Sequence, residues 1–171
     1  AAMSDQTNGR VESVDQLREF YGDQSLLSQQ KFMETLDDHC RVMIAHSSFY
    51  CIATVNPDGS LDVSPRGDPP GSVVVLDPTT LLLPDRKGNN RLDSMSNVTE
   101  RSKTALLFLV SGVLETLRVT GTAEVIHDDA RLAACAIKGQ VPQTGILVKV
   151  EKACLQCGKA VKRGGLWEET Y

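Results

Sequence analysis

The chain has 171 residues, a length that favours one domain with its own hydrophobic core and no need of disulfide crosslinks. Its hydrophobic content of 41%, charged content of 23% and net charge of -4 are ordinary for a globular protein, and they argue against nucleic acid as a partner. No apolar run approaches the roughly 20 residues of a membrane span, and the N-terminus has no signal pattern. We therefore expect a cytoplasmic protein without a membrane partner.

The first residues, 1–12, are polar without periodicity, and we expect them to be disordered. The remainder, residues 13–171, is expected to form a single domain. A helix is predicted to begin after Ser13, whose hydroxyl can cap it, and to end at Gly22.

A second helix is predicted over residues 28–39, where Phe32, Met33 and Leu36 recur at helical spacing. The period then changes to that of strands, and residues 56–59 (Asn-Pro-Asp-Gly) predict a tight hairpin turn between two alternating runs. The predicted strands cover residues 41–47, 49–55, 61–67, 72–77, 79–84, 103–110, 116–126 and 144–153, with helical pieces at 90–98 and 128–137.

This succession predicts a mainly β (α+β) fold with a few flanking helices. Many short antiparallel strands favour a closed barrel, because closure removes exposed strand edges, and a β-sandwich is the competing architecture.

The cysteines do not indicate a disulfide framework, because their number is odd and they are scattered. Cys154 and Cys157 form the one spaced pair. A single CxxC without a second pair or a nearby histidine is weak evidence for zinc, so we expect these thiols to pack and we predict no metal site.

The segment from Arg86 to Arg91 contains basic and amide side chains between a predicted strand and a predicted helix. Backbone N–H groups at a helix start attract anions, and Arg91 can present a bidentate fork, so the segment is a candidate phosphate site. The alternative is a solvated polar loop.

The chain resembles the pyridoxamine 5'-phosphate oxidase-like flavoproteins, the FMN-binding split-barrel superfamily. The resemblance runs from about residue 33 to 150 and is carried by NPDGSLDVSPRGDPPG, LLLPDRKGNNRLDSMSNV, TALLFLV and ETLRVTGTAEV. The lysine of the vitamin B6 oxidases is absent from the basic loop, where Arg91 stands in its place. The chain is therefore closer to the branch of the superfamily whose flavin is kept and whose substrate is unknown.

The resemblance implies a split β-barrel that pairs as a homodimer with FMN at the protomer interface. Arg66 and Arg91 would neutralise the FMN phosphate, although an ion pair between Arg66 and Asp68 is the alternative for the first of them. Trp167 would form a lid beside the flavin or an interface anchor, unless it belongs to a frayed tail. The residues that the resemblance places at the cofactor are Val63, Ser64, Pro65, Arg66, Leu83, Pro84, Asp85, Asn89, Asn90, Arg91, Thr116 and Trp167.

Functionally, the resemblance implies an FMN-binding oxidoreductase acting on an unknown small molecule. No group of residues in the sequence forms a nucleophile–base arrangement, so catalytic residues are not assigned. A non-catalytic flavin- or haem-binding module is the alternative, and a scaffold whose polar loop is only solvated is the third possibility.

Overall fold

The computed structural model describes residues 9–29 and 31–169, so the prediction for residues 1–12 falls largely outside the described part of the chain. The chain divides into two compact units, Ala1–Lys31 and Phe32–Tyr171. The first unit contains the helices α1 (Val14–Tyr21) and α2 (Leu26–Gln29). The predicted helix after Ser13 is confirmed, since the Ser13 hydroxyl accepts the Gln16 N–H and the helix stops at Gly22.

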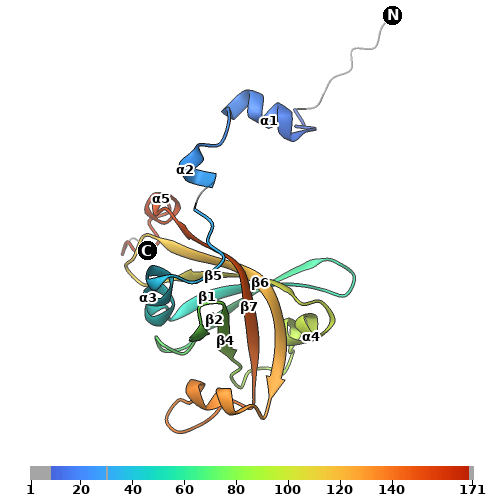
Figure 1. The fold of residues 1–171 in the computed structure, drawn as a ribbon, viewed down its shortest axis with the longest axis vertical. Coiled ribbons are helices and arrows are strands. Elements are labelled where there is room, and N and C mark those ends of the chain that lie inside the picture. Colours follow the sequence, from blue (N-terminus) through green and yellow to red (C-terminus); the bar gives the residue numbers. More distant parts are fainter. Residues whose placement is uncertain (1–8, 30, 170–171) are drawn as a thin grey trace, which may run out of the picture. The chain divides into compact units, whose positions relative to one another are not determined.

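The second unit is built on one sheet of seven antiparallel strands among the described residues, in the order β2-β1-β5-β6-β7-β4-β3. The two longest strands, β6 and β7, pair with each other (Figure 1). Because all strands share one sheet, a sandwich of two sheets is excluded and the mainly β prediction is confirmed. The strands are β1 (Phe49–Val55), β2 (Leu61–Gly67), β3 (Val74–Asp77), β4 (Thr80–Pro84), β5 (Lys103–Leu109), β6 (Thr116–His127) and β7 (Thr144–Gln156), accompanied by α3 (Asp38–His46), α4 (Asp93–Glu100), the 3₁₀ helix η1 (Ala130–Cys135) and α5 (Lys159–Arg163).

The edges of the sheet are β2 and β3, and the sheet curls so that β2 approaches the end of β4. Two ion pairs cross this seam: Arg66 with Asp85 and Arg86 with Asp68. The barrel is therefore open along one line, between the end of β2 and the end of β4. This line positions the candidate site described below.

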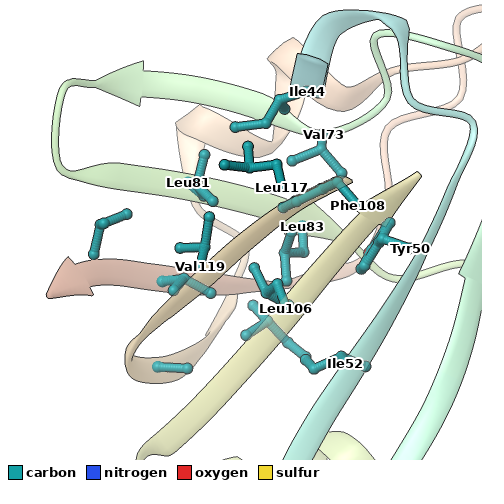
Figure 2. Close-up of a cluster of buried hydrophobic side chains, with 14 of the residues drawn as sticks. Ile44, Tyr50, Ile52, Val73, Leu81, Leu83, Leu106, Phe108, Leu117 and Val119 are labelled. Atoms are coloured by element: carbon teal, nitrogen blue, oxygen red, sulfur yellow. The ribbon is translucent and has the colours of Figure 1, made fainter. Parts of the chain in front are cut away.

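The core fills the inside of the curled sheet (Figure 2). Alternate residues of β1, β5 and β6 are buried, as expected for strands with one face inward, whereas every residue of β4 is buried. The largest fully buried core side chains include Ile44, Ile52, Leu81, Leu83, Leu106, Phe108, Leu117 and Val119.

The predicted helix over 28–39 and the predicted strand over 41–47 are wrong. Met33 instead exchanges two backbone hydrogen bonds with Ala153, beyond the point where β4 stops pairing with β7. Asp37 caps the next helix, α3, by accepting the Cys40 N–H at 2.8 Å. Cys40 and Ile44, four residues apart, are the buried residues of α3, and Leu36, just before the cap, is buried as well.

The other helical predictions are confirmed with shifted bounds. The helix predicted over 90–98 begins only at Asp93, because Asn90 and Leu92 have left-handed backbone conformations that a helix cannot include. The piece predicted over 128–137 contains the 3₁₀ helix η1, capped by Asp129. None of the helices in the described part of the chain has the length and apolar composition that crossing a lipid bilayer requires.

Candidate functional site

A cavity of about 910 Å³ lies at the open seam of the barrel. This volume falls within the range of about 300–1,000 Å³ that is usual for small-molecule sites. Three segments line the cavity: residues 62–66 of β2, residues 85–95 after β4, and residues 140–144 before and at the start of β7. The cavity therefore brings together three parts of the chain that are far apart in the sequence, from Asp62 to Thr144.

The register of β2 decides which of its side chains face inward. Arg66 lies opposite Tyr50, which is buried, so Arg66 faces the inside of the barrel. By alternation Ser64 also faces inward, whereas Val63 and Pro65 face outward and are exposed. Burial raises the pKa of the Tyr50 hydroxyl, which therefore stays protonated at neutral pH.

The two ion pairs across the seam differ in geometry. Arg86 donates from Nε to Asp68 Oδ2 at 3.0 Å and from Nη2 to the Cys135 carbonyl at 3.1 Å, so its guanidinium is held by two partners. The Arg66–Asp85 pair is looser, with Nη1 and Oδ1 separated by 3.5 Å. The Arg66–Asp68 pair considered from the sequence is not formed, because each of these side chains pairs across the seam.

The loop between β4 and α4 is organised by its own side chains. Asn89 Oδ1 accepts the Arg91 N–H at 3.1 Å, and the Arg91 guanidinium pairs with Asp93 at 2.8 Å. Lys87 makes no hydrogen bond or ion pair with the described residues. No side chain caps the N-terminus of α4, whose first residues border the cavity. This end of the helix therefore presents unsatisfied N–H groups and a positive dipole end to the cavity.

Helix α4 is fixed to the barrel by a buried polar contact. Asn97 Nδ2 donates to Thr54 Oγ1 at 3.0 Å, and both side chains are buried. Thr144 Oγ1 donates to Met95 Sδ at 3.6 Å where the first turn of α4 meets the start of β7. The N-terminus of α4 is thus held at the cavity by contacts within the barrel.

The structure brings most of the sequence-predicted residues to this cavity. The predicted residues that line it are Val63, Ser64, Pro65, Arg66, Asp85, Asn89, Asn90 and Arg91. Leu83 and Pro84 lie beneath it, around a narrow gap that they share with Tyr50 and Ile146. Leu83 and Pro84 therefore do not line the cavity itself.

Thr116 and Trp167 do not line the cavity of their own chain. Thr116 begins β6, three strands from β2, and pairs with Leu109 on β5. The Trp167 indole N–H donates to the Val113 carbonyl at 2.8 Å, in the turn between β5 and β6. Both residues therefore lie near the same end of β6.

Sequence reasoning did not assign the wall formed by residues 140–144. These residues lie far along the chain from residues 86–91, and all but Thr144 fall between the helical piece predicted over 128–137 and the strand predicted over 144–153. The one local signal is Pro142 just before β7, which indicates an irregular segment but does not reveal its neighbours.

A family model for pyridoxamine 5'-phosphate oxidase matches residues 36–156. The chain belongs to this family. No curated protein sequence is detectably similar to the chain.

Solved structures share the fold of this chain. A variant of HupZ from Group A Streptococcus is similar with a TM-score of 0.57 and 19% identity, over 71% of this chain and 99% of that one. A Lactobacillus delbrueckii protein described as a pyridoxamine 5'-phosphate oxidase has a TM-score of 0.52 and 27% identity, over 71% and 94%. A Clostridium acetobutylicum protein related to general stress protein 26 has a TM-score of 0.53 and 15% identity, over 70% and 86%. The fold is therefore the split barrel of this family.

Proposed function

We propose that the chain binds FMN in this cavity and acts as an FMN-dependent oxidoreductase on a small molecule. The observation that carries the proposal is the meeting of the uncapped α4 N-terminus, Lys87 and Arg91 at one cavity in the seam of the family's barrel. A phosphate monoester brings nearly two negative charges and several acceptor oxygens, which such a group of donors satisfies.

The chain's residues would then bind and orient the cofactor. Arg91 and Lys87 neutralise the phosphate, and Ser64 and Asn90 add neutral donors. Arg66 lines the cavity beside Asp85, its partner in the looser of the two ion pairs. When bound, FMN supplies the redox chemistry, so no nucleophile or base is required from the chain.

The substitution Arg91→Ala tests the phosphate site. We expect it to weaken FMN binding about tenfold to a hundredfold, since a charge-assisted hydrogen bond contributes about 1.5–3 kcal/mol. Binding is measured by titration of FMN fluorescence. Arg41→Ala, which removes a positive charge from α3 outside the cavity, is the matched control and should bind as the wild type does. Wild-type affinity in Arg91→Ala would show that the phosphate lies elsewhere.

The redox role is tested on the FMN-loaded protein. Anaerobic addition of NADH or NADPH should bleach the visible absorption of the bound flavin if a reduced nicotinamide is the electron donor. Tight FMN binding without reduction by either nucleotide would favour a non-catalytic flavin-binding module. A cytoplasmic location stays a prediction from the sequence.

A homodimer that shares the flavin completes the proposal. The outward face of β2, β1 and β5 is apolar and accessible, and we call it the outer face: Phe49, Cys51, Ala53, Val55, Leu61, Val63, Pro65, Ala105, Leu107 and Leu109. Contiguous apolar surface of this kind marks an interaction site. Val63 and Pro65 belong both to this face and to the cavity wall.

The geometry of a two-fold axis explains the position of the remaining predicted residues. Thr116 and Trp167 lie at the β6 end of the outer face, and the cavity lies at its β2 end. In an isologous interface the two ends of the patch face each other across the axis. A second copy seated on this face would therefore bring its Thr116 and Trp167 to the cavity of the first.

A further inference from the structure

The cavity has two walls of different chemistry. Residues 85–93 carry the basic side chains described above. A second wall is formed by residues 140–144, which belong to the segment 137–144 that we call the flap. The flap residues that line the cavity are uncharged and present the amides of Gln140 and Gln143 and the apolar side chain of Val141. One ligand with a phosphate at the first wall would thus meet a neutral surface at the second.

Several backbone contacts hold the flap in place. Ile137 and Gln140 exchange N–H to carbonyl hydrogen bonds of 3.1 and 2.9 Å. The Gln143 carbonyl lies 3.0 Å from His127 Nδ1. Arg86 binds the carbonyl of Cys135, just before the flap, and its other partner is Asp68. Arg86 therefore ties the start of the flap to the loop after β2.

The segment leading into the flap is also packed from beneath. Leu132 and Cys135 form a buried cluster with Leu82 of β4. At Gly145, just after the flap, a Cβ would meet Leu132 Cδ2 at 2.9 Å and Leu82 Cδ1 at 3.1 Å, so both ends of the flap are closely packed. Val141 is 54% exposed although the segment around it is anchored at several points. Val141 is therefore exposed on a segment that its contacts hold in place.

Two amide side chains of the flap are free to bind a ligand. Neither Gln140 nor Gln143 uses its side-chain amide in a hydrogen bond with the described residues. Each amide offers a carbonyl acceptor and two N–H donors. Together with Val141 they match a flat, uncharged ring system that has donors and acceptors along its edge.

We infer that the flap is the ring-recognition wall of the cavity, where Gln140 and Gln143 bind the edge of the flavin ring and Val141 contacts its surface, while the phosphate lies at the α4 wall. This inference rests on the proposed function. It assigns specificity for the ring to residues that the phosphate does not touch.

The test compares FMN with riboflavin, which has the same ring and no phosphate. Gln140→Ala and Gln143→Ala should each weaken both ligands by the same factor, about threefold to tenfold, as expected for one neutral hydrogen bond. Val141→Asp should weaken both as well, since it places a carboxylate against the ring. Arg91→Ala should weaken FMN alone. Lys138→Asn, in the flap but outside the cavity, is the matched control and should change neither affinity.

The outcomes separate the two proposals. Suppose that the wild type binds FMN and that Arg91→Ala weakens this binding. Unchanged riboflavin affinity in both glutamine variants and in Val141→Asp would then overturn the role of the flap and leave the FMN site intact. An effect of the glutamine variants on FMN but not on riboflavin would also overturn it. No binding of FMN to the wild type would overturn both. Thermal melts of each variant confirm that the compared proteins are folded.

Discussion

Leu92 has a left-handed backbone (φ 59°) in the loop that lines the cavity, and its side chain is 51% exposed. For a residue with a Cβ this conformation is unfavourable by about 1–2 kcal/mol. Leu92 directly precedes α4, and its carbonyl accepts the Ser96 N–H at 2.8 Å, the first hydrogen bond of the helix. The loop therefore stores backbone strain beside the candidate site.

Replacement of Leu92 by glycine should relieve this strain. We expect Leu92→Gly to raise the free energy of unfolding by about 0.5–1 kcal/mol, because glycine adopts positive φ without a steric cost. The greater entropy of the unfolded glycine variant offsets part of this gain. Urea denaturation measures the change. Leu92→Ala keeps the Cβ and should bring no such gain. A glycine variant less stable than the alanine variant would show that the leucine side chain contributes more than the strain costs.

The residue scale also shows how far the sequence could predict the site. Asn89, Asn90 and Arg91 could be placed at the cavity because they are adjacent in the chain and precede a helix. The partners of Arg66 could not be predicted in this way. Asp68 is its neighbour in sequence, yet the curl of the sheet brings Asp85, just after β4, to Arg66. Asp68 pairs with Arg86 instead.

Helix α3 illustrates the same point for an element. Its N-terminus was misplaced because Phe32, Met33 and Leu36 also fit a helical period. The competing contact is the pairing of Met33 with Ala153, more than 100 residues away, which no local pattern reveals. The strands were predicted better, since alternation of buried and exposed residues is local. The hairpin of β1 and β2 has the predicted strand bounds, 49–55 and 61–67, on either side of the predicted turn.

The cap of α3 leads to a prediction with a pH dependence. Asp37 accepts the Cys40 N–H, and this hydrogen bond lowers the pKa of the Asp37 carboxyl below its ordinary value of 3.8. Asp37→Ala should lower the free energy of unfolding by about 1 kcal/mol at neutral pH, as for other N-cap residues.

The sign of the pH effect follows from the direction of the pKa shift. Because the folded protein binds the Asp37 proton less tightly than the unfolded chain, the stabilisation is present above pH 3.8 and is lost as the pH falls below it. The difference between wild type and Asp37→Ala should therefore shrink in acid. Urea denaturation at neutral pH and at about pH 3 measures it. A difference that stays constant or grows in acid would contradict the capping role.

At the scale of the whole molecule, the outer face leads to a prediction about assembly. Leu107 belongs to this face, on β5 beside Cys51 of β1, and is 38% exposed without lining the cavity. Leu107→Glu places a charge where the proposed dimer is dry, so it should convert the dimer to a monomer in sedimentation at micromolar concentration. Val42→Glu, at another exposed apolar residue on α3, should leave the assembly unchanged. A wild-type monomer that still binds FMN would rule out the shared site.

The central claim is that the seam cavity binds FMN. The most direct measurement is a fluorescence titration of FMN with the purified full chain. We predict saturable quenching that ends at one FMN per chain, with loss of affinity in Arg91→Ala. Unchanged FMN fluorescence at protein concentrations well into the micromolar range would contradict the account, whatever the fold resembles.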